Sequence, residues 1–425
     1  MIRQTVIEHS EPSSNGHGAR FLFYSHDGFG LGHTRRNLAI AAALTQICPG
    51  SSVLLASGAD DVHRLGLPPG VEALKLPAVR KIKNDQYVAR RLRVEMAEIR
   101  AIRAALLEAA VKSFRPEVVL VDKHVLGAGG EFLNGLLALQ AYGGRAVLGL
   151  RDILDEREAV LKDWTGNGVA EAIAQFYDRV LIYGARGVFD PVTEYDMPEA
   201  LVPRISFCGY VVNSDLHAPL TDTPLFLTPQ QSDRSIVLAT TGGGEDGYAL
   251  LETFIRAAEG SAWQGVVIGG PLAPEGQLTQ LRAMAAQAGV IFNTFVPRLP
   301  VLFDSIDALV CMGGYNTLSE AMFQGMPTVC VPRVTPRSEQ LLRARAFERM
   351  GLLRAVHPAE LNAKSLRDQV QAALGLSRPE LRNRVRTTLK FDGARNAAAE
   401  LLDLARIAKT PREVKAKSAL RVGVQ

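Results

Sequence analysis

Three glycine-rich segments of the 425-residue chain are suited to hold an anionic or strongly polar ligand. Gly28, Gly30 and Gly32 follow an apolar run and open an apolar-periodic stretch, and residues 240–244 and 312–314 follow later apolar runs. Glycine lets a ligand approach backbone N–H groups closely, and the dipole of a following helix favours negative charge there. The alternative is that these glycines only tighten the connection between a strand and a helix.

The spacing of the glycines disfavours two common phosphate-binding motifs. The first segment reads G-x-G-x-G instead of the dinucleotide fingerprint G-x-G-x-x-G, and no acidic residue ends a clear second strand. The sequence Thr-Thr-Gly-Gly-Gly at 240–244 lacks the Gly-Lys-Ser/Thr ending of a P-loop. Binding of NAD and phosphoryl transfer by a P-loop mechanism are therefore not expected.

Histidine and aspartate residues near the first glycine segment are the candidates for acid–base catalysis. His33 ends that segment, where His26 and Asp27 also lie, and Asp122 and His124 follow the apolar run Val-Val-Leu-Val. An imidazole with a pKa of about 6.5 is suited to take a proton from a hydroxyl group. The alternatives are a helix cap or a packed side chain for His33, and a strand-end turn for Asp122 and His124.

Short apolar runs alternate with helical patterns, which is typical of parallel strands joined by crossover helices. The predicted strands lie at 20–24, 53–56, 73–76, 118–121, 146–150 and 180–182, then at 235–240, 265–268, 308–311 and 328–331. The predicted helices include 34–44, 88–114 and 394–407. We therefore predict an α/β protein with two Rossmann-like open-sheet domains that face a cleft.

Composition sets the predicted domain boundaries. Prolines and polar residues are frequent from 183 to 234, and the chain ends in a basic, poorly patterned segment. The predicted parts are a flexible N-terminus at 1–18, a first α/β domain at 19–215, a linker at 216–234, a second α/β domain at 235–407 and a basic tail at 408–425.

The most informative segment runs from residue 312 to residue 340. It reads Met-Gly-Gly-Tyr-Asn-Thr-Leu-Ser-Glu-Ala, passes Gly325 and Met-Pro, enters a predicted strand, and reaches Glu339 and Gln340 at a helix start. This order places polar groups from successive loops at the carboxyl end of one sheet, where open α/β sheets bind ligands.

The pattern GGxNTxxEAxxxGxPxVxVPR, followed by EQxxRA, resembles the inverting GT-B glycosyltransferases, the group that includes MurG and the monogalactosyldiacylglycerol synthases. The resemblance covers residues 235–351 well and the first half mainly through Gly32-His33. It implies a GT-B fold in which the second domain binds a nucleotide diphosphate sugar, typically a UDP-sugar, and the first binds an acceptor. The implied reaction is transfer of a hexosyl residue to an acceptor hydroxyl with inversion.

The resemblance also implies roles for individual residues. Glu320 matches the carboxylate that accepts hydrogen bonds from the ribose hydroxyls, Phe295 and Val296 match residues beside the base, and Glu339 and Gln340 match contacts to the donor sugar. The residues that would hold the diphosphate are Thr241, Gly242, Gly243, Gly244, Gly313, Gly314, Asn316 and Thr317. His33 matches a functional histidine, and the acceptor side would comprise Gly30, Gly32 and Arg35.

We expect no cofactor and no metal, because the chain has no Asp-x-Asp sequence that could bridge a metal to the diphosphate. Helix dipoles and Arg298 or Arg333 would stabilise the leaving group instead. The base would be His33 or the Asp122/His124 pair. The family usually has Pro-Ala after the histidine, whereas this chain continues Thr-Arg-Arg, so Arg35 and Arg36 either meet an anionic acceptor or are solvated surface residues.

Two other functions share these features. A non-hydrolysing sugar-nucleotide epimerase has the same fold, but we find no motif for its additional acid–base residues. A non-catalytic nucleotide-sugar-binding subunit would keep the donor residues and tolerate loss of the histidines.

The composition indicates where the protein acts. A net charge of +4 is too weak to argue for nucleic acid, and four scattered cysteines without a CxxC pair fit a reducing cytoplasm. We expect neither a spanning segment nor a signal peptide. The basic stretch 79–110 is predicted to be helical, and either rests on anionic lipid at the inner face of the membrane or is an amphipathic crossover helix. The sequence indicates no oligomeric state.

Overall fold

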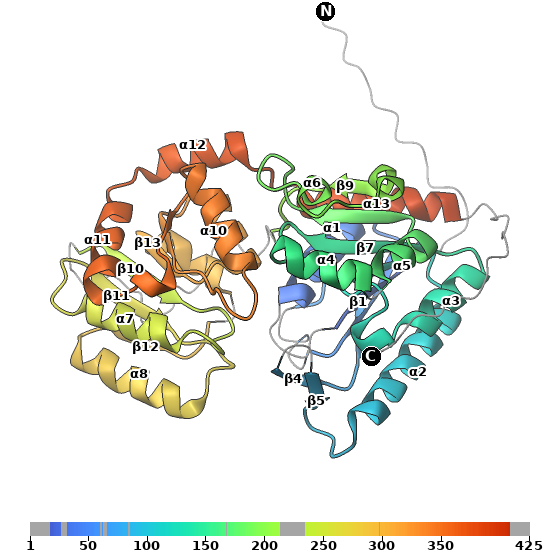
Figure 1. Ribbon diagram of the computed structural model, residues 1–425, viewed down its shortest axis with the longest axis horizontal. Helices are drawn as coiled ribbons and strands as arrows, with labels where there is room; N and C mark the ends of the chain where they lie inside the picture. Colours follow the sequence, from blue (N-terminus) through green and yellow to red (C-terminus); the bar gives the residue numbers. More distant parts are fainter. Residues whose placement is uncertain are drawn as a thin grey trace, which may run out of the picture.

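The protein folds into two α/β lobes that lie side by side (Figure 1). The computed structural model describes residues 18–26, 32–59, 62, 66–83, 86–166, 168–212, 234–296 and 298–408. The predicted N-terminal segment, linker and basic tail fall almost entirely outside the described residues, as do Gly28 and Gly30.

The first lobe is built on a seven-stranded parallel sheet with the order β3-β2-β1-β6-β7-β8-β9. Its strands are β1 (Arg20–Ser25), β2 (Ser52–Ser57), β3 (Val71–Lys75), β6 (Val118–Asp122), β7 (Arg145–Arg151), β8 (Arg179–Tyr183) and β9 (Ile205–Phe207). The strand order reverses between β1 and β6, and loops that leave the carboxyl ends of the strands at such a point form a binding crevice.

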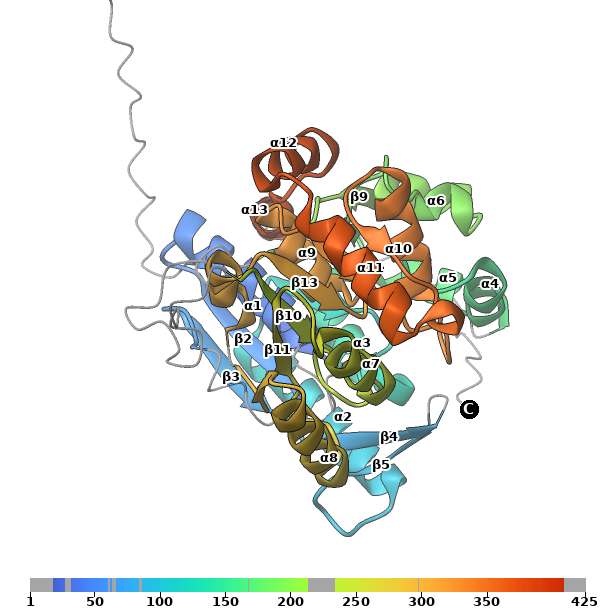
Figure 2. The same ribbon diagram turned by 90° about the vertical axis from the view of Figure 1, so that its left-hand side faces the viewer.

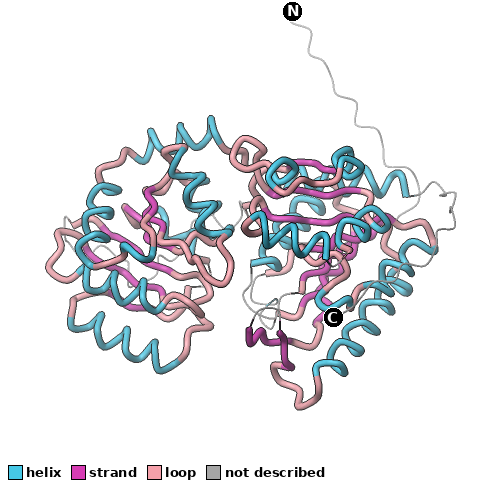
Figure 3. Tube along the Cα trace, viewed as in Figure 1, coloured by secondary structure: helices cyan, strands magenta, loops and turns pink. Residues whose placement is uncertain are grey.

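Helices cover both faces of this sheet, as Figure 3 shows. Those formed by the first half of the chain are α1 (Gly32–Ile47), α2 (Met96–Phe114), α3 (Leu133–Ala141), α4 (Arg157–Gly166), α5 (Val169–Phe176) and α6 (Pro191–Glu194). Short 3-10 turns lie at Ala128–Gly130 and Glu199–Arg204. The central strands are buried almost throughout, because both of their faces pack against helices.

The second lobe has a six-stranded parallel sheet with the order β12-β11-β10-β13-β14-β15. Its strands are β10 (Ile236–Thr240), β11 (Gln264–Ile268), β12 (Ile291–Asn293), β13 (Ala308–Cys311), β14 (Thr328–Cys330) and β15 (Arg354–Ala355). Its helices are α7 (Tyr248–Ala258), α8 (Glu275–Gln287), α9 (Tyr315–Phe323), α10 (Glu339–Arg349), α11 (Ala363–Leu374) and α12 (Arg378–Thr388), with 3-10 turns at Leu299–Ser305 and Pro358–Glu360. The predicted fold class, two Rossmann-like α/β domains, is confirmed.

The last helix, α13 (Gly393–Ala408), crosses back to the first lobe. It packs on α1 and contacts β6 and β7, and Leu401 and Leu404 bury their side chains there (Figures 1 and 2). Asn396 Nδ2 donates to the carbonyl of Cys208 at 2.8 Å. The second domain predicted from the sequence, 235–407, includes this helix, because sequence order alone does not reveal a return crossing.

The basic stretch at 79–110 is not a single helix. Its first part forms an antiparallel hairpin of β4 (Val79–Lys83) and β5 (Gln86–Ala89), and α2 begins only at Met96. The prediction of a helix from residue 88 was therefore wrong at its start. Two turn-forming residues, Asn-Asp, separate the short runs Val-Arg-Lys-Ile-Lys and Gln-Tyr-Val-Ala, which contain β-branched and aromatic residues, and this order is a hairpin signal.

Replacing Gly325 with alanine is expected to lower the free energy of unfolding by about 1–3 kcal/mol. Gly325 follows α9 with φ of +62°, and a Cβ there would lie 2.7 Å from Cβ and 2.8 Å from Cα of Arg382 on α12. Urea denaturation followed by circular dichroism measures the effect. The matched control is Gly276→Ala within α8, where an added Cβ meets nothing within 4 Å. Equal stability of the two variants would contradict the tight contact between α9 and α12.

Candidate functional site

His33, Asp122 and Arg36 form a polar cluster at the strand reversal of the first sheet. β6 ends at Asp122, and α1 places His33 on its first turn and Arg36 one turn later. His33 Nδ1 lies 3.1 Å from Asp122 Oδ1, and Arg36 Nη2 donates to Asp122 Oδ2 at 2.6 Å and to Oδ1 at 2.9 Å. The Asp122 side chain is fully buried, whereas that of His33 is 16% exposed. The histidine is therefore the member of the cluster that a substrate can reach.

Arg36 also lies 2.8 Å from His33 Nδ1 through its Nη2 atom. A guanidinium can only donate, so this hydrogen bond requires an unprotonated Nδ1, whereas a bond to Asp122 requires a protonated one. The two contacts therefore select opposite tautomers of His33. Only the tautomer paired with Asp122 leaves the lone pair on Nε2, which is the form that can act as a base through that nitrogen.

Arg36 is buried between two aromatic rings. Its Cζ atom lies 5.1 Å from the ring centre of Tyr183 in the first lobe and 5.3 Å from that of Tyr315 in the second. Burial alone would raise the pKa of Asp122, but Arg36 and then His33 outweigh it and hold the pKa of Asp122 below its usual range. Asp122 is therefore an anion at neutral pH. The prediction that Arg36 is solvated or meets an acceptor was wrong, and its position three residues after His33 could have placed both on one helix face.

The other histidines of the loop region gather beside this cluster. The ring of His26 lies 4.9 Å from that of His33 and 4.2 Å from that of His124, measured between ring centres. Burial first, and then the neighbouring His124 and His33, lower the pKa of His26 well below its ordinary value. His26 is therefore neutral near pH 7, and it packs against the two candidate bases.

The second lobe brings Glu320 to the same place. Glu320 lies on α9, is 5% exposed, and accepts a hydrogen bond from Arg35 Nη2 at Oε1 over 2.6 Å. Its Oε2 atom is buried and has no hydrogen-bond partner among the described residues. Burial raises the pKa of Glu320, and Arg35 opposes that rise. A buried acceptor without a partner points to a group that the site is built to receive.

Asn316 makes a second contact between the lobes, four residues before Glu320 on α9. Its Nδ2 atom donates to the carbonyl of Gly32 at 3.0 Å. Gly32, Arg35, Asn316 and Glu320 thus form one contact, which we call the α1–α9 contact. It places the predicted donor residues of α9 against the turn of α1 that carries His33.

The two glycine loops of the second lobe leave neighbouring strands. Thr240 of β10 pairs with Cys311 of β13, so residues 241–244 and 312–314 both lie at the carboxyl edge of the sheet. Gly313 has a φ of +84°, and a Cβ there would lie 2.8 Å from Cys330 Sγ. Only glycine fits this position, and the turn directs the chain into α9. Thr241, Gly242, Gly243, Gly244, Gly313, Gly314, Asn316 and Thr317 therefore gather at one edge, as the sequence predicts.

Glu339 and Gln340 begin α10 beside this edge. Glu339 Oε1 accepts from Arg333 Nη2 at 2.9 Å, and Gln340 Oε1 accepts from the backbone N–H of Arg333 at 3.1 Å. Arg333 Nη1 also donates to Asp246 at 2.9 Å, just after the Thr-Thr-Gly-Gly-Gly loop. Burial would raise the pKa of Glu339, but Arg151 and Arg333 outweigh it and lower that pKa. Arg333 therefore ties two predicted donor loops together.

Phe295 and Val296 follow β12, the edge strand, which β11 separates from β10. Phe295 is 41% exposed, and Val296 is half-buried. An exposed aromatic ring at a carboxyl strand end is suited to stack on a flat base. Contact of Phe295 and Val296 with the base of the donor therefore stays a prediction.

A buried ion pair that the sequence does not predict also joins the lobes. Asp152, directly after β7, accepts from Arg343 of α10, with Nη2 at 2.7 Å from Oδ1 and Nε at 2.9 Å from Oδ2. Both side chains are 1% exposed. Arg343 Nη1 also donates to the Gly313 carbonyl at 3.2 Å, so this pair fixes the glycine turn relative to the first lobe.

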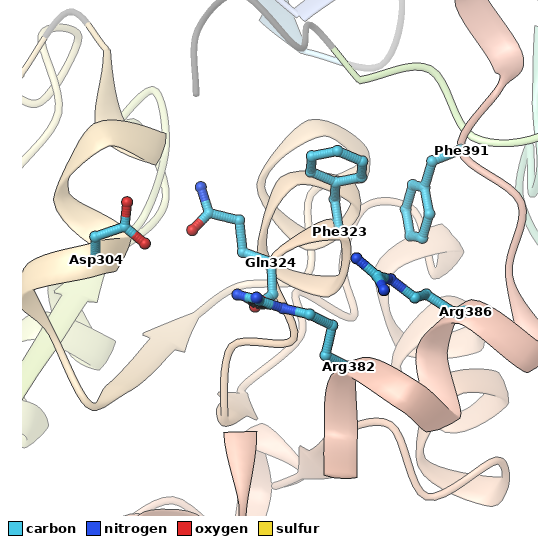
Figure 4. A pocket seen from close by; sticks show the side chains of 6 residues that line it. All are labelled: Asp304, Phe323, Gln324, Arg382, Arg386 and Phe391. Carbon is cyan, nitrogen blue, oxygen red and sulfur yellow. Dashed lines mark hydrogen bonds between the residues drawn. The ribbon is translucent and has the colours of Figure 1, made fainter. Parts of the chain in front are cut away.

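A cavity of about 280 Å³ opens at the far end of α9 and does not belong to this site (Figure 4). It is lined by Asp304, Phe323, Gln324, Arg382, Arg386 and Phe391. Figure 4 shows Phe323 and Gln324 at the end of α9 and Arg382 and Arg386 on α12. Phe391 follows α12, and Asp304 lies in the 3-10 turn Leu299–Ser305. None of the predicted site residues lines it.

The described residues contain no group of three or more His, Cys, Asp or Glu side chains that could hold a metal ion. In the same part of the chain, no helix is long and apolar enough to cross a membrane.

Comparisons with known proteins agree with this fold. Residues 268–397 match the glycosyltransferase family 28 C-terminal domain. The UDP-N-acetylglucosamine--N-acetylmuramyl-(pentapeptide) pyrophosphoryl-undecaprenol N-acetylglucosamine transferase of Nocardia farcinica is 26% identical, over 94% of this chain and 99% of its own length. The crystal structure of Acinetobacter baumannii MurG matches with a TM-score of 0.54 at 15% identity, over 92% of this chain and 100% of that one. The chain is a MurG-like GT-B glycosyltransferase.

This MurG-like chain also resembles the NDP-glycosyltransferase YjiC of Bacillus subtilis, at 30% identity over 40% of the chain. That match spans about two fifths, 42%, of YjiC. The family 28 match includes Asn316, Glu320 and Arg343, but it begins at residue 268 and so does not contain the catalytic candidates of the first lobe. In this MurG-like protein, the roles of His33 and Asp122 therefore rest on their geometry.

Proposed function

We propose that the protein transfers a hexosyl residue from a UDP-sugar to an acceptor hydroxyl group, with inversion at the anomeric carbon and without a cofactor or divalent metal. The observation that carries this proposal is that the first turns of α1 contact both the candidate acid–base cluster of the first lobe and the candidate donor carboxylate of the second. On this helix His33 meets Asp122, and two residues later Arg35 meets Glu320 of the second lobe. A candidate base and a candidate donor carboxylate therefore converge from different lobes.

His33 is the proposed base. Asp122 holds the proton on Nδ1, so Nε2 can take the proton of the acceptor hydroxyl while its oxygen attacks the anomeric carbon. The bond between that carbon and the diphosphate oxygen breaks, and the electron pair leaves with UDP. Because Asp122 is anionic, it also stabilises the imidazolium that forms. A single displacement of this kind inverts the anomeric centre.

The leaving diphosphate would lie at the N-terminus of α9. The backbone N–H groups of Gly314 and the first turn of that helix have no helical partner, and the helix dipole favours negative charge there. Arg333, tied to Asp246 and Glu339, adds a cation beside the same edge. These groups would stabilise the negative charge that develops on the leaving diphosphate.

Incubation with UDP-sugars and measurement of released UDP tests the activity, with lipid, polysaccharide and small-metabolite fractions as separate acceptor arms. The Nocardia relative is named for a UDP-N-acetylglucosamine donor and a lipid pyrophosphate acceptor, which makes that pair the first to try. We also propose that the protein acts in the cytoplasm, with peripheral contact to the inner face of the membrane when the acceptor is a lipid. No UDP release with any donor and acceptor would contradict the transferase, whereas epimerised UDP-sugar would identify the epimerase.

The substitution Glu320→Gln is expected to weaken UDP binding by about 10- to 100-fold, because it removes the charged acceptor for the ribose hydroxyls. Isothermal titration calorimetry with UDP measures the change. Glu275→Gln is the matched control, since Glu275 is exposed on the outer helix α8. Equal UDP affinity for the Glu320 variant and the control would contradict the donor-site assignment.

A further inference from the structure

We propose that Arg35 competes with the donor ribose for Glu320, so that donor binding must first open the α1–α9 contact. This inference rests on the proposed function and concerns the regulation of the same site. The carboxylate that would receive two ribose hydroxyls presents one oxygen to Arg35 and one buried oxygen without a partner among the described residues.

Arg35 already occupies one of the two oxygens of Glu320. Arg35 Nη2 approaches Glu320 Oε1 at 2.6 Å, a short and charge-assisted hydrogen bond. The Glu320 side chain is 6% exposed, and that of Arg35 is 21% exposed. Two vicinal hydroxyls that bind a carboxylate through both of its oxygens meet the guanidinium at Oε1, so the ribose and Arg35 compete for that oxygen. Since Arg35 is the more exposed partner, it is the one that can move.

A second contact on the same face of α9 supports the competition. Asn316 precedes Glu320 by four residues, so their side chains lie one above the other along the helix. The Asn316 amide donates to the Gly32 carbonyl at 3.0 Å. Two residues that the family resemblance assigns to the donor are thus both engaged by the first turn of α1. Donor binding therefore affects how this turn, which carries His33, is held.

The remaining contacts between the lobes do not depend on this one. Asp152 and Arg343 join the lobes through a buried pair that involves neither Arg35 nor Glu320. The backbone N–H of Val211 also donates to the hydroxyl oxygen of Tyr315 on α9 at 2.9 Å. Release of Arg35 is therefore a local rearrangement, and the lobes stay joined.

The test is a double-mutant cycle on UDP and uridine binding, measured by isothermal titration calorimetry with the full chain. Arg35→Gln should tighten binding of both ligands by about fivefold or more, the lower end of usual coupling between sites. In a Glu320→Gln background the same substitution should have no effect, because the competition is already absent. Arg35→Lys should lie between Arg35→Gln and the parent chain.

The outcomes separate the competition from the proposed function. Weaker UDP binding by Arg35→Gln, in either background, would show that Arg35 holds the diphosphate and would overturn the inference. Unchanged binding by Arg35→Gln, with Glu320→Gln still weakening UDP binding, would overturn the competition alone. If the parent chain binds neither UDP nor uridine, the proposed donor site fails, and the competition fails with it.

Discussion

Replacing His33 with alanine is expected to lower the rate constant for sugar transfer by about 10²- to 10⁴-fold, the usual contribution of a positioned general base. His33 is the partly exposed member of the buried cluster with Asp122 and Arg36. Without the imidazole, no group held by Asp122 can take the acceptor proton. UDP affinity should stay within about twofold, since the proposed donor-binding groups lie on the other lobe.

The experiment compares kcat from UDP release with the UDP dissociation constant for the same preparations. His357→Ala is the matched control, because His357 caps a 3-10 turn in the second lobe by accepting from the Ala359 backbone N–H. Loss of kcat in both variants, or in neither, would contradict the assignment of His33.

The pKa of Asp122 is depressed, so its contribution to stability is present above the unfolded-state pKa and is lost only in strong acid. Any fall of kcat on the acidic side of the pH–rate profile should therefore not come from protonation of Asp122.

Substituting Arg343 with leucine is expected to lower the free energy of unfolding by about 3–5 kcal/mol, because it leaves the carboxylate of Asp152 buried without its partner. Both side chains are 1% exposed, and their separation is 2.7 Å at the closest atoms. Replacing both partners, as Asp152→Leu with Arg343→Met, should recover most of this loss, since it removes both buried charges.

Urea denaturation followed by tryptophan fluorescence and circular dichroism measures these changes. Arg256→Leu serves as the control, because Arg256 is exposed and pairs with Glu252 one turn away on α7. This control substitution should lower the free energy of unfolding by less than about 0.5 kcal/mol. A cost for Arg343→Leu no larger than that of the control would show that the lobes are not joined by this pair in solution.

The sheets, and the sheet edge that gathers the proposed donor residues, could be predicted because their signals are local. Each predicted strand overlaps an observed one, since a buried parallel strand is a continuous apolar run. The loop before α9 was found in the same way, because Gly313 and Glu320 lie within one short segment that leaves β13. Periodicity and turn residues within about ten positions suffice for such features.

The contacts between the lobes could not be predicted in this way. Asp152 and Arg343 are 191 residues apart, and Arg35 and Glu320 are 285 apart. No periodic pattern relates residues at such distances, and a charged residue in a single sequence gives no sign that its partner lies across a domain boundary. Arg36 shows the same problem, because an arginine on a first helical turn is usually solvated. The hairpin at Val79–Ala89 was missed for a different reason, because its two short strands lack a clear two-residue alternation of apolar and polar residues.

The return of α13 has a consequence for how the molecule is made. The first lobe buries Leu401 and Leu404 of this helix against its own sheet and α1, so its hydrophobic surface includes residues synthesised almost 200 positions after β9. During translation the first lobe must keep that apolar strip exposed until the entire second lobe has left the ribosome. The second lobe, by contrast, can complete its own sheet as soon as α12 is made. The first lobe is therefore synthesised first but completes its hydrophobic core last.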